Sequence, residues 1–318
     1  FSHQITARGR PSQSSHFDAF WFAMKDRGIP EGEGRRKQGG RMLSVNGRTE
    51  LPWGFHGVVN INYLSSLEFR LAFTETLNEA ISSEAHSVGY VTKSFSSFVI
   101  NAALVRHENF QTTEKDDTIL IRKLPSVEFN SREHDLARRG PLPLYLTLDS
   151  AFELLGRRQQ GFRTRQLAER LDFFPRLSTK LFWKGFHLTP TFGLHQTYYG
   201  ETMRPEGTVS GEGLRRSARE FSLELAPPAL ARVFNNRFKH VIEPRLSYRH
   251  VAGVPDFRRI LRFDERDLLN NTSEAELSLI QRLYGKRRDT GEVRELLSFE
   301  LWQRRYFDPT FGGAVVDG

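Results

Sequence analysis

The sequence predicts an all-β protein, specifically an antiparallel transmembrane β-barrel, to which this chain contributes roughly 14 strands of a larger barrel. The prediction depends on three segments, residues 239–250, 274–283 and 295–307, in which apolar and polar side chains alternate. Successive side chains of a strand point to opposite faces, so each segment has one apolar and one charged face. The segments also have about the 9–11 residues of a membrane strand, against about 5–6 in a typical soluble strand. A long soluble sheet is the alternative.

Composition excludes a helical membrane protein. Of the 318 residues, 38% are hydrophobic, and no stretch approaches the roughly 20 consecutive apolar residues that a spanning helix needs. The mean hydropathy of −0.50 is compatible with a membrane barrel, because apolar residues there alternate with polar ones. The 26 Phe, 8 Tyr and 4 Trp residues suit aromatic girdles at the membrane interfaces, although a soluble β-rich core would use them too.

The chain contains no cysteine, which excludes a disulfide or a thiolate metal site within it. Its formal net charge of +8 suggests anionic partners such as phosphate-bearing lipid or nucleic acid, but solvated basic loops explain the charge equally well. The chain starts at Phe1 without a Met or an apolar leader, and it stops at Gly318 without a terminal strand. We therefore expect both ends to be cut from a longer protein.

The other strands are expected between stretches rich in Gly, Pro and charged residues. In chain order they lie at residues 17–25, 42–49, 56–64, 67–76, 84–93, 96–107, 118–130, 142–154, 170–180, 186–199 and 220–226. A tight turn at Trp183-Lys-Gly185 predicts a hairpin, because Gly adopts the left-handed conformation readily.

The connections between these strands alternate in length. They are tight at Ser65, Phe95 and Lys184 and long in between, as in outer-membrane barrels. The Gly- and charge-rich loop at residues 28–40 breaks this alternation. We therefore expect that one of the strands predicted near the start of the chain is assigned wrongly. The loop between the strands at 239–250 and 274–283 has room for a short helix at residues 257–269.

Residues 67–76 give the cleanest alternation in the chain. A buried helix would spread their apolar side chains around all its sides, so we predict a strand. The alternation here and in the three C-terminal segments assigns side chains to the two faces. The lipid-facing set is Leu67, Phe69, Leu71, Phe73, Leu246, Leu277, Leu279 and Phe299. The set expected to line a polar lumen is Arg70, Arg245, Arg249 and Arg282.

No catalytic or metal-binding motif is present, and we expect neither an enzyme nor a cofactor. The chain lacks His-Glu-x-x-His, Gly-x-Ser-x-Gly and the phosphate-binding Gly-x-x-x-x-Gly-Lys-Ser/Thr. Its ten His residues are scattered. Residues 258–267 carry both charge signs and could suggest a metal or nucleic-acid site, but pairing within the loop is the simpler interpretation.

The C-terminal segments resemble a known family. Lys239-His-Val-Ile-Glu-Pro-Arg-Leu-Ser-Tyr-Arg is followed by Arg262-Phe-Asp-Glu-Arg-Asp-Leu-Leu and by Asn271-Thr-Ser-Glu-Ala-Glu-Leu-Ser-Leu-Ile-Gln-Arg-Leu-Tyr. This order resembles the outer-membrane LPS-assembly proteins, the barrel subunits of the lipopolysaccharide translocon. Residues 62–73 are also similar to this family, so the resemblance extends over most of the chain.

The resemblance implies a protein of the Gram-negative bacterial outer membrane that inserts lipopolysaccharide into the outer leaflet. It implies that residues 1–318 are part of one C-terminal barrel domain, with a periplasmic jellyroll and the closing strands absent from the segment. The implied partners are lipopolysaccharide, a lipoprotein that plugs the barrel, a periplasmic lipopolysaccharide-transport bridge and membrane lipids, with no nucleic acid. Many relatives carry cysteines that join the two domains, and this segment has none.

Two other functions are compatible with the residues alone. A passive porin-like channel would show the same alternation, and a plugged translocator differs from it in conducting poorly. A soluble β-rich carbohydrate-binding protein would bury the apolar faces in a protein core instead of exposing them to lipid.

Overall fold

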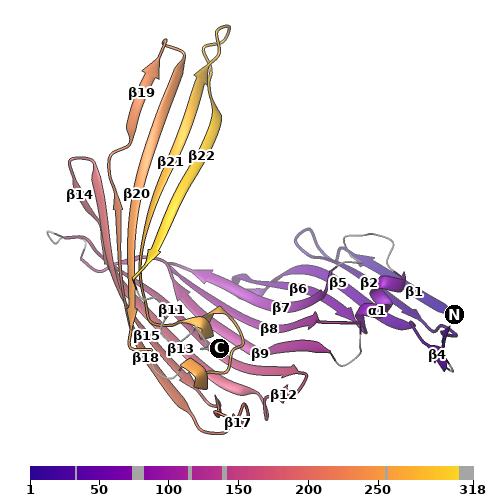
Figure 1. Ribbon diagram of the computed structural model, residues 1–318. Helices are drawn as coiled ribbons and strands as arrows, with labels where there is room; N and C mark the ends of the chain where they lie inside the picture. Colours follow the sequence, from indigo (N-terminus) through magenta and orange to yellow (C-terminus); the bar gives the residue numbers. More distant parts are fainter. Residues whose placement is uncertain (33, 74–81, 114–116, 138–141, 255–256, 308–318) are drawn as a thin grey trace.

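The computed structural model describes residues 1–32, 34–73, 82–113, 117–137, 142–254 and 257–307, and most of them form one 18-stranded antiparallel sheet. Each long strand pairs with the next long strand along the chain, which gives an up-and-down meander (Figure 1). The long strands are β1 (Ser2–Gly9), β2 (His16–Met24), β5 (Gly40–Leu51), β6 (Phe55–Leu64), β7 (Glu84–Phe95), β8 (Phe98–Phe110), β9 (Thr118–Ser131), β11 (Leu144–Gln159), β13 (Ala168–Thr179), β15 (Phe186–Tyr199), β18 (Leu214–Ala226), β20 (Phe238–Ala252), β21 (Thr272–Lys286) and β22 (Val293–Tyr306).

Short elements complete the structure. Four short strands belong to the large sheet: β10 (His134–Asp135), β12 (Phe162–Arg163), β14 (Leu181–Trp183) and β19 (Leu230–Phe234). Two small ribbons stand apart from it, β3 (Ile29–Glu31) with β4 (Gly34–Arg36), and β16 (Thr202–Met203) with β17 (Val209–Ser210). The helical elements are α1 (Leu67–Phe73), η1 (Pro52–Gly54), η2 (Phe257–Arg259) and η3 (Glu265–Leu268).

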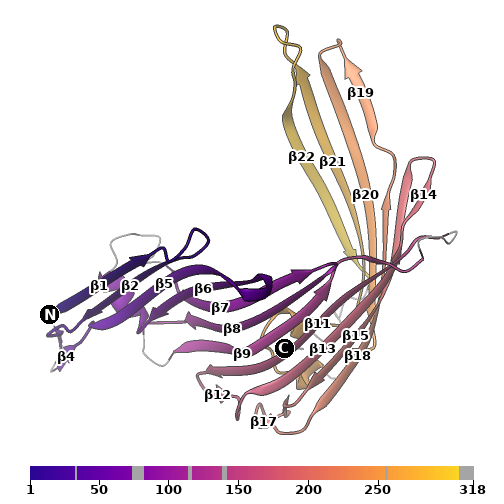
Figure 2. The same ribbon diagram turned by 180° about the vertical axis from the view of Figure 1, so that it is seen from behind.

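The predicted all-β antiparallel architecture is confirmed. The sheet is strongly curved, and its two outer strands, β1 and β22, lie far apart in both views (Figures 1 and 2). Over the residues that the structure describes, no pairing joins β1 to β22, so the sheet is open. Strands of this length twist and coil together, as the wall of a barrel does.

Among the described residues, no helix is both long and apolar enough to cross a membrane.

The connections divide between two ends of the sheet. At one end, which we call the turn end, lie η1 between β5 and β6 and the Lys184–Gly185 turn, where both residues have positive φ. The longer link that contains β19 also lies at this end. At the other, the loop end, lie longer links that include α1 and residues 253–271. The hairpin predicted at Trp183-Lys-Gly185 is therefore confirmed.

The strand predicted at residues 67–76 is wrong. Leu67–Phe73 is the helix α1, and residues 74–76 lie outside the described residues. Phe69 is 1% exposed and stacks on Phe22 with ring centroids 5.8 Å apart. A Cβ built on Gly40 would lie 2.8 Å from the Phe69 ring, which shows how closely the helix approaches β5.

Replacing that strand by a helix makes the connections between β2 and β8 alternate between the loop end and the turn end. The connection from β6 to β7 now belongs to the loop end, and so does the connection from β2 to β5 that contains β3 and β4. The strand β1, which the sequence did not predict, pairs with β2 from Ser2↔Met24 to Gly9↔Phe17. The loop at residues 28–40 therefore fits the alternation of connections, and the error lay in predicting a strand at residues 67–76.

Candidate functional site

The sheet has two faces whose side chains follow the register, because directly paired residues of antiparallel strands share a face. On one face the register aligns Asp172, Thr197 and Arg216 across β13, β15 and β18. On the other face it aligns leucines across four strands, Leu188↔Leu225, Leu225↔Leu246 and Leu246↔Leu277. We call these the polar face and the apolar face.

The predicted residues of the three C-terminal segments lie as the alternation indicates. Arg245, Arg249 and Arg282 are on the polar face, paired with Ser278, Glu274 and Val241. The apolar set lies on the opposite face, where Leu246, Leu277 and Phe299 are 43%, 46% and 49% exposed. Leu279 shares that face with its partners Pro244 and Leu301. Their contact with lipid, and a role of the arginines in a lumen, stay predictions.

The predicted residues of 67–73 lie differently. Phe69 packs with Leu67 and Phe73 against Met42 and Leu64, which are on the polar face, so these three side chains do not point to the apolar face. Leu71 belongs to the same helix and is exposed.

Arg70 lies on α1 rather than on a strand. It donates to the main-chain oxygens of Ser82 and Glu84, the second at 3.0 Å. It therefore secures the chain that enters β7.

The loop that joins β20 to β21 is described at residues 253–254 and 257–271, and this part of the loop folds back over the polar face. Ile260, Leu261 and Phe263 are almost completely buried. Leu261 and Phe263 pack in one cluster with Leu155 of β11 and Ala168 of β13. In the sheet, β18 and β15 lie between β20 and the paired strands β13 and β11, so the loop crosses β18 and β15 to reach them. The apolar residues of the loop thus pack against Leu155 and Ala168 on the polar face.

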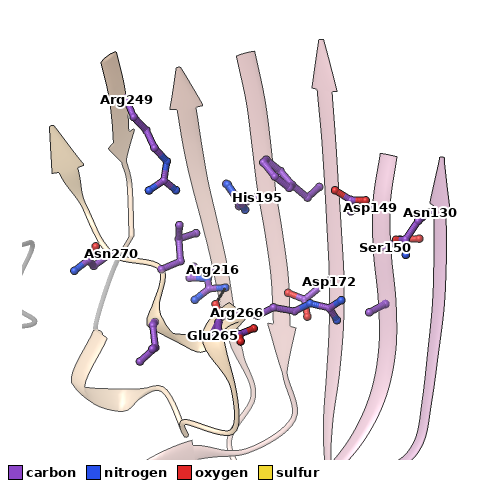
Figure 3. Close-up of a pocket in the computed structure, with 14 residues that line it drawn as sticks. Asn130, Asp149, Ser150, Asp172, His195, Arg216, Arg249, Glu265, Arg266 and Asn270 are labelled. Carbon is purple, nitrogen blue, oxygen red and sulfur yellow. Dashed lines mark hydrogen bonds between the residues drawn. The ribbon is translucent and has the colours of Figure 1, made fainter. Parts of the chain in front are cut away.

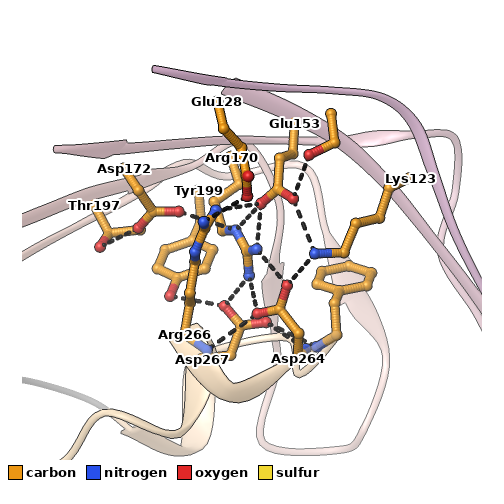
Figure 4. A network of polar contacts seen from close by, with 12 residues as sticks. Lys123, Glu128, Glu153, Arg170, Asp172, Thr197, Tyr199, Asp264, Arg266 and Asp267 are labelled. Atoms are coloured by element: carbon orange, nitrogen blue, oxygen red, sulfur yellow. Dashed lines mark hydrogen bonds and ion pairs between the residues drawn. The ribbon is translucent and has the colours of Figure 1, made fainter. Parts of the chain in front are cut away.

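Arg170 of β13 is the centre of the contact between loop and sheet (Figure 4). Its side chain is fully buried, with Nη1 donating to Asp264 Oδ1 at 2.9 Å and to Asp267 Oδ1 at 2.7 Å. Nη2 donates to Asp264 Oδ2 at 2.7 Å, and Nε donates to Glu153 Oε2 at 3.0 Å. Glu153 and Asp267 are also fully buried. A buried guanidinium is tolerated when its donors are paired with carboxylates, as they are here.

Two further cations complete this network. Lys123 of β9 donates to Glu153 at 2.9 Å and also pairs with Asp264. Arg266 of the loop donates to Glu128 of β9 at 2.7 Å and to Glu153 at 3.3 Å. The loop therefore contributes charges of both signs, and each meets its opposite on the sheet.

The loop's own fold presents these carboxylates. Asp264 caps η3 by accepting from the Arg266 main-chain N at 3.1 Å. Asp267 Oδ2 accepts from the main-chain N of Phe263 at 2.8 Å. Burial alone raises the pKa of Asp264, but hydrogen bonds and charge from Arg170 and Lys123 outweigh it and hold that pKa well below its ordinary range.

The prediction that residues 258–267 pair mainly within the loop is wrong. The strongest partners of Asp264, Arg266 and Asp267 are on β9, β11 and β13. The partners Glu153 and Arg170 were not predicted. Their only sequence signal is a charge within an expected strand, which a solvated face explains equally well.

A cleft of about 470 Å³ lies beside this network on the polar face (Figure 3). The His195 ring stacks on Phe174 with centroids 3.6 Å apart, and His195 Nε2 lies 2.9 Å from Glu220 Oε2. Arg249 also donates to Glu220, at 3.0 Å. The cleft thus combines an aromatic surface with charged side chains.

Arg216 forms part of the lining of the cleft. It is 2% exposed and donates to Thr197 Oγ1 at 3.0 Å and to the Arg266 main-chain oxygen at 2.9 Å. Within the described part of the chain, no carboxylate lies at ion-pair distance from it, so its charge is only partly compensated. In the same part of the chain, no group of three or more His, Asp or Glu side chains is arranged to hold a metal ion.

Comparison with known proteins agrees with the residues and the fold. No curated protein matches the chain. A family model described as LPS transport system D matches residues 40–308, which include every long strand from β5 to β22. The chain therefore belongs to the family of LptD, LPS transport system D, whose members are lipopolysaccharide-transport components of the outer membrane.

Proposed function

We propose that this chain forms part of the wall of a translocon that inserts lipopolysaccharide into the outer leaflet of the outer membrane. The observation that carries this proposal is the separation of the two faces, which the register maintains from β2 to β22. Lipopolysaccharide has acyl chains and a charged saccharide, and a wall with one apolar and one polar face offers each part a matching surface.

The polar face supplies groups suited to an anionic saccharide. The cleft holds the stacked pair of Phe174 and His195, and aromatic rings of this kind bind the apolar faces of sugars. Arg216 and Arg249 line the same cleft, and guanidinium groups bind phosphate and carboxylate groups well. Charges placed on a fixed wall attract the saccharide without a covalent step.

The two edges of the sheet support a larger assembly. Every residue of β22 is exposed, and β1 is exposed over nearly its whole length. Long open edges pair readily with further strands, so we infer that closing strands complete this barrel domain. A periplasmic jellyroll, a lipoprotein plug in the lumen and a periplasmic bridge that delivers lipopolysaccharide complete the proposed translocon.

Site-specific photo-crosslinking in cells that make the full-length protein tests this proposal. A crosslinking residue placed at Arg249 or Glu276, on the polar face, is expected to form adducts with lipopolysaccharide during transport. The same residue at Leu246 or Leu277 is expected to form adducts with bilayer lipids. Absence of lipopolysaccharide adducts at both polar positions, in cells that assemble a normal outer membrane, would contradict the proposal.

A further inference from the structure

A groove crosses the apolar face over strands β2 and β5 to β8. Three glycines line it on neighbouring strands, Gly47 of β5, Gly57 of β6 and Gly89 of β7. The register places them on one face, because Gly47 and Gly89 both pair with Val59 and Gly57 pairs with Val91. A Cβ built on Gly47 or Gly57 would contact the side chain of Val59 or Thr49, whereas the space over Gly89 is open.

The walls of this glycine groove are mainly apolar, although His16, Arg48 and Thr49 also contribute to the lining. Phe17 pairs with Gly47, and Leu104 pairs with Gly89, so both side chains stand on the same face beside the glycines. The groove has a volume of about 580 Å³, which lies within the roughly 300–1,000 Å³ of ordinary ligand sites. Gly89 marks its open part, since a Cβ built there meets no atom within 4 Å.

We propose that the glycine groove binds one acyl chain of an anionic glycerophospholipid. The inference rests on the apolar face meeting lipid, as the proposed function requires. Lipid tails gain nothing from burial as such, because they are already in hydrocarbon. A chain that enters the groove gains the close packing that a flat strand surface does not give, since an unfilled depression forfeits dispersion contacts.

A cation marks the end of the groove where the headgroup lies. Lys93 follows Val91 by two residues and so stands on the same face, close to the groove. Its Nζ lies 5.1 Å from the centre of the Phe55 ring, and the nearby Trp53 is 85% exposed. Aromatic and lysine side chains are typical of the membrane interface, where lysine attracts lipid phosphate.

The position of the groove along the strands indicates which leaflet, and therefore which class of lipid, it contacts. Leu51 and Gly57 flank η1 at the turn end of the sheet, and both line the groove. Short turns of outer-membrane barrels face the periplasm, so the groove lies in the leaflet opposite to the one that receives lipopolysaccharide. The occupant is therefore a glycerophospholipid and not a molecule on its way out.

Native mass spectrometry of the full-length protein, purified from membranes in mild detergent, tests the proposal. The wild-type protein is expected to retain one anionic glycerophospholipid. Gly89→Leu places a side chain in the open part of the groove, where a Cβ meets no atom within 4 Å, and is expected to lower retention about tenfold. Ala275→Leu introduces a leucine side chain on the same apolar face on β21, away from the groove, and is expected to retain the lipid. Heat-dependent electrophoretic mobility confirms that both variants fold.

Lys93→Gln is expected to remove the preference for anionic over zwitterionic lipid, because the chain still fits the groove. Equal retention by the wild-type protein and Gly89→Leu would overturn the proposal, and so would equal loss with Ala275→Leu. Retention of lipopolysaccharide in place of glycerophospholipid would overturn the assigned occupant. Crosslinks from Arg249 to lipopolysaccharide report on the proposed function independently, so failure of one proposal is distinguishable from failure of the other.

Discussion

Arg170 Nη1 donates to Asp267 Oδ1 at 2.7 Å, and both side chains are fully buried although 97 residues separate them. This ion pair joins the loop at residues 253–271 to β13, two strands beyond β18. Because each partner would otherwise leave a buried charge uncompensated, the loop and the sheet hold each other in one arrangement. The loop therefore occupies the polar face as a fixed part of the structure.

Arg170→Met is expected to release this loop. The change leaves Glu153 and Asp267 buried with fewer donors, which costs roughly 3–5 kcal/mol of the docking free energy. Hydrogen exchange of residues 257–268 in the full-length protein measures the release. Arg176→Met on the same strand breaks the half-exposed pair with Asp149 and is expected to cost at most about 1 kcal/mol. Slow exchange of the loop in Arg170→Met would show that apolar packing alone holds it.

Leu261→Ala is expected to weaken loop docking without changing any charge. Leu261 is 1% exposed and packs in one cluster with Leu155 and Phe263, so truncation leaves a cavity that costs roughly 2–5 kcal/mol. Leu268→Ala serves as the control, since that side chain is 53% exposed. Limited proteolysis within the loop reports the difference. Equal cleavage of the two variants would refute a structural role for the cluster.

The loop is expected to stay docked as the pH falls from 7 to about 5. Arg170 and Lys123 hold the pKa of Asp264 below its ordinary value of 3.8, so the stabilisation by this carboxylate is fully present above that value. It is lost as the pH falls below 3.8 towards the lower pKa of the docked state. Hydrogen exchange as a function of pH measures this dependence. Asp264→Asn is expected to exchange faster at neutral pH and to lack the corresponding part of the acid response. Undocking of the wild-type loop between pH 7 and 5 would contradict this assignment.

Spin labels are expected to distinguish the two faces in a bilayer. Labels at Leu246, Leu277 and Phe299 should collide with oxygen dissolved in lipid, whereas labels at Arg245 and Glu276 should collide with a water-soluble relaxant. A lipid-like signal at all five positions would argue against a polar lumen. The face alternates at every residue, so neighbours such as Arg245 and Leu246 are matched controls.

Release of the loop is expected to raise ion conductance. The docked loop covers the polar face between β11 and β21, so the intact protein should conduct poorly in a planar bilayer. Arg170→Met should open this space and increase conductance, and Arg176→Met should leave it unchanged. High conductance of the wild-type protein would favour a passive porin-like channel.

The helix α1 shows where sequence reasoning failed. Leu67, Phe69, Leu71 and Phe73 recur at every second residue, which is the period of a strand. A segment of seven residues is too short for its period alone to separate helix from strand, and tertiary packing overrides local pattern. Contacts of Phe69 with Phe22 and of its neighbours with Met42 decided the outcome.

The sequence by itself determined the all-β architecture and the polarity of the faces at residues 239–307, because alternation along a strand is a local property that a paired neighbour only reinforces. It also determined the hairpin at Lys184–Gly185, because Gly185 adopts the left-handed conformation readily. Only the tertiary structure decided that Asp264 and Asp267 meet Arg170 and Glu153. A local sequence pattern does not indicate which distant strand a charged loop residue will contact. That contact depends on the curvature of the sheet (Figure 1) and on the packing of Leu261.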